Sequence, residues 1–501
     1  MERPAGPETP RQKIPWWVVT TYFAEGFPYS LVRQISTVFF KDAGASLQSI
    51  GLTSLYGLPW TLKFLWAPLV DSFSTKRRWI LAAESVLLAL ALVLAGVSTL
   101  TAALPLAAVV FLLLAVTSAT HDIAIDGYYL ETLDRTGQAR WVGFQAGSYR
   151  LALIAGGGGV IALSGVTSWP LGFLLAAAIL GTLLALHAVI LPATERPRRP
   201  AVEILRFLAR PATLGILGLV VALGAGLRWA LARPELAPLR RLAGALSVPG
   251  WITLALFAAL AVMATRAPAI KRRLYASDST YALAFVDYLD QRRVGLILAF
   301  VALYRTGESF LLNMAYPFLH DIGVSRAAYG VAYGTFGVGA SIVGGLVGGA
   351  LIARWGLRRC IWPFVLAQNL LNLLYMLMAW KYQAIFQHPE LGRADLRLVT
   401  ALIVAESFGA GLGTSAFMVF IMRTTRPAYK AAHMAIATGI ATVSSTLAGV
   451  LSGFLASALG FTLYFGLTFA ATIPAMVMIP FLPYLDRPRE ERGSGEVKLE
   501  G

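Results

Sequence analysis

The chain consists of long apolar segments separated by short polar loops. A helix needs roughly 20 apolar residues to cross the hydrocarbon core of a bilayer, and such segments follow one another through almost all of the 501 residues. They are continuous apolar runs without the alternation of transmembrane strands, which excludes a membrane β-barrel. The pattern predicts about fourteen transmembrane helices, at residues 16–40, 47–70, 79–100, 102–130, 141–165, 168–191, 212–232, 246–265, 294–319, 327–353, 360–380, 397–421, 431–457 and 462–485.

The composition agrees with an integral membrane protein. Hydrophobic residues make up 57% of the chain and charged residues 14%, whereas a soluble protein has about 25% charged residues. These values exclude a disordered protein, a nucleic-acid-binding domain and a secreted disulfide scaffold. The chain has one cysteine, Cys360, and therefore neither an intrachain disulfide nor a cysteine metal cluster. We expect no metal site and no cofactor.

The net charge of +16 has a topological explanation. If the N-terminus lies inside, 29 of the 42 Lys and Arg residues fall in inner segments and 8 in outer segments. Positive residues concentrate in the cytoplasmic loops of membrane proteins. We therefore expect a multi-pass protein of the inner, or plasma, membrane with both termini in the cytoplasm, and the basic excess does not indicate nucleic-acid binding.

Charged linkers divide the chain into two six-helix halves. A Pro- and Arg-rich stretch at 192–211 ends the first six spans, and a charged stretch at 266–293 precedes the last six. Two plain hydrophobic spans lie between these linkers. The expected organisation is an N-terminal bundle at 1–191, a linker with two extra transmembrane helices at 192–293, a C-terminal bundle at 294–485 and a cytoplasmic tail at 486–501.

A basic inner loop follows the second span of each half. Matching loops at equivalent points indicate a parallel repeat, and the second loop is similar to the signature loop of the major facilitator superfamily. We therefore expect an all-α major facilitator fold of two six-helix bundles with two inserted helices. Both loops are candidate gating loops, and a generic basic inner loop is the alternative for each. Their candidate residues are Asp71, Arg77 and Arg78 in the first loop and Gly349, Arg354, Gly356, Arg358 and Arg359 in the second.

Two aspartates in the fourth span are the best candidates for proton coupling. An ionisable group at mid-bilayer costs about 2.5–3.5 kcal/mol on insertion scales, so such residues usually face a cavity or a partner. Asp122 and Asp126 are four residues apart on one helix face. Two carboxylates about 6 Å apart in a low-dielectric cleft resist double ionisation, which is the requirement for a proton-binding site. The alternative is a structural pair bonded to a basic neighbour such as Arg150 or Lys76.

Further charged residues are candidates for the substrate cavity. Arg305 and Glu308 are three residues apart, so they either line the pathway or neutralise each other within the helix. Glu25 and Arg33 flank a Gly-Pro break in the first span and lie on similar faces. Glu406 either lines the cavity or is satisfied by packing.

The presence of other polar and small residues within spans can be explained without a role in transport. Lys63 lies at membrane depth or reaches toward a membrane face. Glu84 and His187 are interpreted as lone polar residues with local partners. The four consecutive glycines at 156–159 predict close helix packing or a bend. They do not form a phosphate-binding loop, because no strand precedes them and no Gly-Lys-Ser/Thr follows.

Five segments of the chain form a recognisable set: LKFLWAPLVD, SATHDIAIDGYYLETL, SYRLALIAGGG, LYRTGESF and ESFGAGLGTSAF. Together they resemble the AmpG-type muropeptide permeases, in the peptide/acetyl-coenzyme A/drug transporter branch of the major facilitator superfamily. The resemblance runs from about residue 16 to 485. It implies proton-driven uptake of anhydromuropeptides across the bacterial inner membrane for cell-wall recycling. It places the paired acidic residues of the family on Asp122 and Asp126, and its tyrosine–arginine pair on Tyr149 and Arg150.

The chain departs from the permease pattern in its first span, which differs throughout, and at His121. The HDIAIDGYYLETL run is also close to acetyl-coenzyme A transporters of the same branch. An acetyl-CoA or acyl-CoA transporter, or a drug or peptide transporter, is therefore the alternative within the family.

We expect a monomeric proton-coupled secondary transporter, not an enzyme. Arg33, Arg150 and Arg305 would bind an anionic solute, because guanidinium groups pair with carboxylates bidentately. The alternative from another class is a membrane enzyme for acyl transfer or lipid processing, with His121 and Asp122 as its acid–base pair. That alternative is disfavoured because adjacent helix positions point about 100° apart.

Overall fold

The computed structural model describes residues 16–63, 66–100, 103–133, 135–192, 248–276, 280–387, 394–426 and 430–485, with isolated positions at 200, 222, 226, 229 and 233. Across these ranges the regular structure is entirely helical, which confirms the predicted all-α class. Apart from the isolated positions, the predicted span 212–232 and the tail 486–501 lie outside the described residues.

Within the described ranges, nine helical segments are long and apolar enough to cross a membrane. Eight of them coincide with predicted spans, and the last one contains the two final predicted spans. The segments are Lys76–Val97, Ala103–Thr132, Gly147–Val166, Trp169–Ile190, Val294–Asp321, Arg326–Trp355, Leu357–Lys381, Leu396–Thr424 and Ile436–Phe481.

The first two predicted spans are helical but interrupted. The first consists of α1 (Trp16–Ser30), the π-helix η1 (Leu31–Ile35) and α2 (Ser36–Asp42). Pro28 lies near the end of α1, where its missing N–H weakens the α-helical hydrogen-bond pattern. The second consists of α3 (Leu47–Leu52), the 3₁₀ helix η2 (Thr53–Gly57), α4 (Leu58–Leu62) and α5 (Ala67–Ser72).

The remaining N-terminal helices form a bundle around an aromatic core. Phe39 contacts Phe111 and Phe173 with ring centroids 6.0 and 5.6 Å apart. Large side chains on the outer faces stay exposed, such as Val109 at 54% and Val189 at 84%, as expected of surfaces that contact lipid. The helices are α6 (Lys76–Val97), α7 (Ala103–Thr132), α8 (Arg135–Ile154), the π-helix η4 (Ala155–Val160), α9 (Ile161–Val166) and α10 (Trp169–Ile190).

The linker contributes α14 (Val248–Tyr275) and α15 (Thr280–Leu289). Residues 266–275, predicted to belong to the charged linker, therefore continue the helix. The C-terminal half follows, and the non-helical backbone of Gly460, with φ of 71° and ψ of 161°, divides α24 into two helices between the last two predicted spans. Its elements are α16 (Val294–Leu303), α17 (Thr306–Asp321), α18 (Arg326–Tyr329), the π-helix η6 (Gly330–Gly337), α19 (Val338–Trp355), α20 (Leu357–Asn369), α21 (Leu371–Lys381), α22 (Gln383–Gln387), α23 (Leu396–Thr424), α24 (Lys430–Ala470), α25 (Ile473–Met478) and the 3₁₀ helix η9 (Ile479–Phe481).

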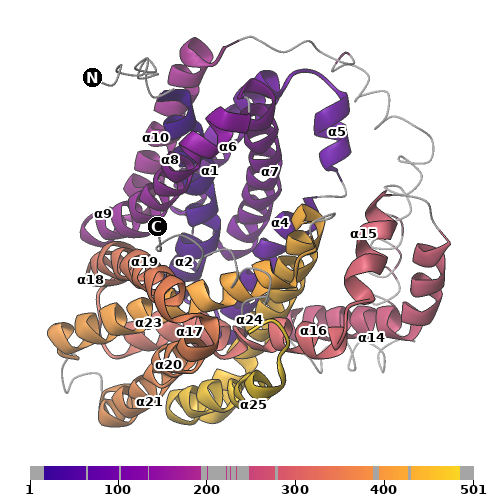
Figure 1. Cartoon of the computed structure of the whole chain (residues 1–501). Coiled ribbons are helices and arrows are strands. Elements are labelled where there is room, and N and C mark those ends of the chain that lie inside the picture. Colours follow the sequence, from indigo (N-terminus) through magenta and orange to yellow (C-terminus); the bar gives the residue numbers. More distant parts are fainter. Residues whose placement is uncertain are drawn as a thin grey trace, which may run out of the picture.

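The two halves meet along helices that carry glycines where they touch. Figure 1 shows the N-terminal half, indigo to magenta, above the C-terminal half, and α9 and α18 lie side by side. The π-helices η4 and η6 are in contact, and α24 packs on α3 and η2. A Cβ added at Gly330 would lie 2.7 Å from the Ala162 nitrogen, and one at Gly51 would lie 2.9 Å from the Gly449 carbonyl oxygen. Close packing was one of the two predictions for the glycine run, and the structure confirms it there, since a Cβ at Gly158 would meet Thr335.

Two ion pairs join the halves at one end. Lys41 pairs with Asp321 at 2.7 Å, and Asp42 pairs with Arg326 at 2.6 Å. The orientation predicted from the charge distribution places these residues at the outer face, and we call this the outer end. In this structure the two halves are therefore joined at the outer end.

Candidate functional site

Lys63 is the basic partner of the paired aspartates. Its ammonium donates to Asp122 Oδ2 and lies 3.8 Å from Asp126 Oδ2. Lys63 is the C-cap of α4, directly at the break in the second span, and the break sets the ammonium against α7. The sequence left two positions open for the Lys63 side chain, at membrane depth or toward a membrane face. The structure places it at the aspartate pair. Lys76, considered as another partner, donates to the Val70 carbonyl oxygen at 3.0 Å.

Two residues of α1 complete this cluster. The Tyr22 hydroxyl donates to Asp126 Oδ1 at 3.1 Å. Glu25 is 9% exposed and lies within interaction range of Asp122, and its Oε2 atom has no hydrogen-bond partner among the described residues. Edge contacts between aromatic rings hold α1 against α7, with the Tyr22 and Tyr129 centroids 5.5 Å apart. Three carboxyl groups thus share the ammonium of Lys63.

The cluster lies at the edge of the packed core. The Asp126 side chain is 46% exposed and the Lys63 side chain 33%, whereas Asp122 is 11% exposed. Asp126 and Lys63 therefore lie at the edge of the packed helices, and Asp122 and Glu25 lie deeper.

Arg33, which sequence spacing puts on a similar face to Glu25, makes its hydrogen bond to the second span. The π-helix η1 begins between them. The Arg33 guanidinium donates to the Ser54 carbonyl oxygen at 3.1 Å, and the Ser54 hydroxyl donates to Asn313 of the C-terminal half at 2.7 Å. Tyr149 lies in the same region, within interaction range of Arg33.

The predicted tyrosine–arginine pair separates into two environments. Tyr149 is partly buried and packs on α1, since a Cβ at Gly26 would lie 3.1 Å from the Tyr149 ring. Arg150, the next residue on α8, is exposed.

In the C-terminal half, Arg305 and Glu308 form the intrahelical ion pair that was one of the two predictions for them. The guanidinium makes two hydrogen bonds of 3.0 Å to the carboxylate. Arg305 is the N-cap residue between α16 and α17, and Gln368 donates to Glu308 Oε2 at 2.6 Å. Tyr29 of the N-terminal half lies within interaction range of Arg305, so the two halves of the candidate site face each other.

Glu406 lies deeper in the C-terminal half. It is 3% exposed, accepts a hydrogen bond of 3.2 Å from the Ser407 hydroxyl and lies within interaction range of Glu308. Glu406 thus lies near the carboxylate of Glu308, which is the residue that pairs with Arg305. Whether Glu406 lines the solute pathway stays a prediction.

The interpretation of Glu84 and His187 as lone polar residues is wrong. His187 Nδ1 lies 2.5 Å from Glu84 Oε1, and His121 Nε2 lies 3.4 Å from the same oxygen. All three side chains are fully buried between α6, α7 and α10. No three His, Cys, Asp or Glu side chains in the described ranges are arranged to hold a metal ion. Because His121 turns toward Glu84, the structure gives no support to a His121–Asp122 acid–base pair. Sequence spacing could not reveal a contact among three separate helices.

The first candidate gating loop is tied to the end of α10. Arg77 donates to the carbonyl oxygens of Leu191 at 2.9 Å and Ala188 at 2.6 Å. A cation at these carbonyl groups also interacts favourably with the helix dipole. Arg78 is exposed, and the side chain of Asp71 lies outside those described.

The second candidate gating loop is a sharp turn. Gly356 has a φ of 81° and separates α19 from α20, and only glycine adopts this conformation without strain. The other candidate residues of this loop are all exposed at the surface, and their gating role stays a prediction. They are Gly349, Arg354, Arg358 and Arg359.

Comparisons with known proteins match most of the chain. Residues 297–500 match the Major Facilitator Superfamily, and residues 26–232 match the BT1 family. The chain is 26% identical to an uncharacterized protein of Haemophilus influenzae, over 83% of this chain and 82% of that protein. It is 23% identical to a protein of Escherichia coli named anhydromuropeptide permease, over 83% of this chain and 68% of that protein.

Solved structures with the same fold include a POT family transporter in complex with 5-aminolevulinic acid. Its TM-score is 0.64 at 14% identity, over 94% of this chain and 96% of that one. An auto-inhibited POT family peptide transporter gives a TM-score of 0.63 at 13% identity, over 94% and 98%. At these identities the likeness concerns the fold, which agrees with the predicted arrangement of two helical bundles.

Proposed function

We propose that this multi-pass chain, whose residues 297–500 match the Major Facilitator Superfamily and residues 26–232 the BT1 family, is a transporter that couples proton entry to the import of anhydromuropeptides or related anionic peptide and sugar-peptide solutes. The name of the Escherichia coli relative supports this substrate class. The protein works as a monomer in the bacterial inner membrane, with both termini cytoplasmic. Its bundles are residues 1–191 and 294–485, with 192–293 as a linker that carries two extra helices.

The observation that carries the proposal is the cluster of three carboxyl groups around Lys63. One ammonium cannot balance Glu25, Asp122 and Asp126 when all three are ionised. An unbalanced carboxylate is costly in a low-dielectric environment, and protonation removes that cost. Asp126, the most exposed of the three, receives the proton first.

Lys63 links the proton to the solute. When the aspartate pair takes a proton, the ammonium of Lys63 loses one of its two ion-pair partners and binds a carboxylate of the solute instead. Proton and anionic solute therefore bind together. The higher proton concentration outside favours loading, and the lower proton concentration inside favours deprotonation of the pair, which restores its ion pairs with Lys63 and releases the solute.

The remaining cationic groups hold the solute between the two halves. Arg33, with Tyr149 beside it, offers donors from the N-terminal half, and Arg305 offers them from the C-terminal half while Glu308 balances part of its charge. Arg150 is exposed on α8 and adds a further positive charge at this half. The basic inner loops gate the opposite side of the molecule from the outer ion pairs.

Uptake into proteoliposomes tests this function. The protein is reconstituted with an imposed pH gradient and offered radiolabelled anhydromuropeptide, acetyl-coenzyme A or a short peptide. We expect the wild type to accumulate the muropeptide and Asp122→Asn to lose gradient-driven accumulation while folding normally. Glu131→Gln is the matched control, because Glu131 is an exposed carboxylate on the same helix.

Two results would contradict the proposal. Normal gradient-driven uptake by Asp122→Asn would show that the aspartates do not couple transport to protons. Accumulation of acetyl-coenzyme A without muropeptide uptake would favour the alternative substrate class of the same branch.

A further inference from the structure

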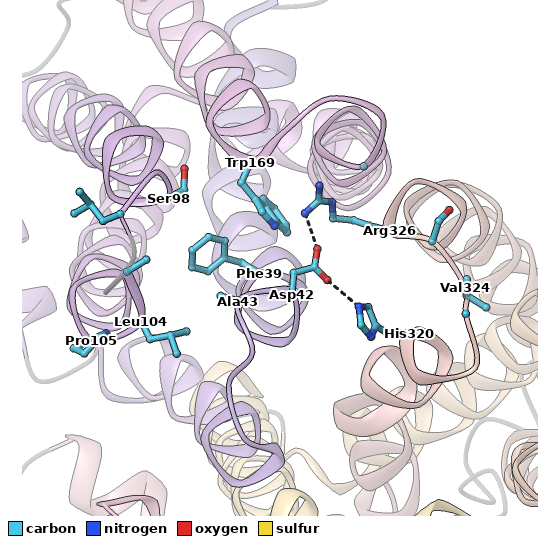
Figure 2. Close-up of a pocket in the computed structure, with 15 residues that line it drawn as sticks. Phe39, Asp42, Ala43, Ser98, Leu104, Pro105, Trp169, His320, Val324 and Arg326 are labelled. Atoms are coloured by element: carbon cyan, nitrogen blue, oxygen red, sulfur yellow. Dashed lines mark hydrogen bonds and ion pairs between the residues drawn. The ribbon is translucent and has the colours of Figure 1, made fainter. Parts of the chain in front are cut away.

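A hollow of about 820 Å³ lies between the two halves at the outer end. Its walls come from α2, α7 and α10 of the N-terminal half and from the segment around His320–Arg326 of the C-terminal half. Figure 2 shows Asp42 between His320 and Arg326, with Trp169 and Phe39 beside them. We call this hollow the outer vestibule. Its volume lies within the range of about 300–1,000 Å³ that is usual for small-molecule sites.

Arg326 joins the two halves through hydrogen bonds and has one further N–H donor without an acceptor among the described residues. One terminal nitrogen donates to Asp42 Oδ2 at 2.6 Å, and the other donates to the Ser164 carbonyl oxygen. The Nε atom is buried and has no hydrogen-bond partner among the described residues. Asp42 therefore occupies one arm of a guanidinium that can bind a carboxylate with two parallel hydrogen bonds.

Trp169, beside Arg326, has a second N–H donor without an acceptor among the described residues. Its ring packs against the Arg326 guanidinium, whose central carbon lies 4.6 Å from the ring centroid. Its indole nitrogen is also buried without a hydrogen-bond partner among the described residues. Buried donors without acceptors are rare and require an explanation. Both atoms belong to residues that line the outer vestibule, so hydrogen-bonding capacity that Asp42 does not use is present beside the hollow.

We propose that the outer vestibule is a second binding site for a carboxylate-bearing solute, in which the solute replaces Asp42 as the partner of Arg326. This inference rests on the proposed function, since the solute that enters here is the one transported. Replacement of Asp42 breaks one of the two ion pairs that join the halves, so binding of the solute at the vestibule weakens the closed outer end.

Asp42 keeps other partners during this exchange. Its second oxygen accepts a hydrogen bond from the Tyr316 hydroxyl. His320 Nε2 lies 3.8 Å from the same oxygen, and the His320 side chain is 42% exposed. The carboxylate of Asp42 can therefore move from Arg326 toward His320 without becoming an unpaired buried charge, which would be strongly unfavourable.

Protection of an engineered cysteine tests the inference. Leu100 is 52% exposed and lines the vestibule, so Leu100→Cys in a Cys360→Ser background reports on this site alone. Spheroplasts are treated with a membrane-impermeant thiol reagent in the presence of N-acetylmuramic acid, or of N-acetylglucosamine, which lacks the lactyl carboxylate. We expect protection by the first sugar and none by the second.

Variants at the ion pair then have opposite effects. Arg326→Gln should raise the half-protecting concentration at least about tenfold, because it removes hydrogen bonds between charged groups. Asp42→Asn should lower that concentration severalfold, because it removes the competing carboxylate, and misfolding cannot produce such a gain. Arg397→Gln is the control, since Arg397 is an exposed arginine in a segment predicted to be outer.

Four outcomes overturn the inference. They are no labelling of the cysteine from outside, equal protection by both sugars, equal behaviour of Arg326→Gln and Arg397→Gln, and weaker binding by Asp42→Asn. If the wild type accumulates muropeptide while protection is independent of Arg326, the vestibule site is refuted and the transport function stands. If protection depends on Arg326 and no pH gradient drives uptake, the transport function fails and the site stands.

Discussion

A single methyl group at Gly330 should prevent the outer end from closing. Gly330 begins η6 and packs on the backbone of α9. A Cβ there would lie 2.7 Å from the Ala162 nitrogen and 3.1 Å from its Cα, whereas ordinary contacts begin near 3.4 Å. The two helices would have to separate by about 0.7 Å. Neither neighbour is a flexible side chain that could move away.

The energetic effect follows from overpacking. Extra atoms in a well-packed interface cost typically about 1–3 kcal/mol, and here the cost is paid only when the outer end is closed. A bias of that size changes the ratio of two conformations by about 5- to 150-fold. Gly330→Ala should therefore populate the outward-open form and slow transport, because the cycle needs both forms.

Distance measurements between spin labels check this prediction. Leu100 and Leu396 are both exposed and lie in different halves at segments predicted to be outer, and labels are attached to cysteines at these positions in a Cys360→Ser background. Gly339→Ala is the matched control, because Gly339 lies on α19, which continues η6, and a Cβ there would meet nothing within 4 Å. Wild-type distances and wild-type uptake in Gly330→Ala would refute the reasoning.

Three further predictions concern other parts of the molecule. Lys63→Met should weaken solute binding by about ten- to hundredfold through loss of a charged hydrogen bond, and binding like that of the exposed-site control Lys381→Met would contradict the role of Lys63. Replacement of Arg358 and Arg359 by Ala should slow transport with little change in equilibrium solute binding, and an unchanged turnover would argue against a gating role. Glu84→Gln breaks a buried group of charges and should destabilise the fold by about 3–5 kcal/mol, which would lower the thermal unfolding temperature. A stability equal to that of Glu131→Gln would show that the group contributes little.

The spans could be predicted from the sequence because membrane thickness imposes a length on every apolar segment. The breaks in the first two spans had a local signal in Pro28 and Pro59. A proline indicates a break but does not indicate which side chain at the break contacts the neighbouring helix. Lys63 could not be assigned to Asp122 from spacing, since 59 positions separate them.

Contacts between helices could not be predicted, because the contacting residues are far apart in the sequence. The intrahelical pair of Arg305 and Glu308 follows from a spacing of three residues. The group of Glu84, His121 and His187 depends on how three helices pack, and no pattern within one helix encodes it. The outer ion pair of Asp42 and Arg326 spans 284 positions, so no spacing within one segment could reveal it.

Both helices at the η4–η6 contact contain a π-helical turn, which has a consequence for how the halves separate. A π turn holds one more residue than an α turn, so it can tighten into α-helix by passing that residue along the chain. Such a one-residue shift turns the following segment by about 100°, which would carry the contacting glycines away from the opposite helix. Local rewinding of one turn could thus part the two bundles, without either of them having to tilt as a rigid body.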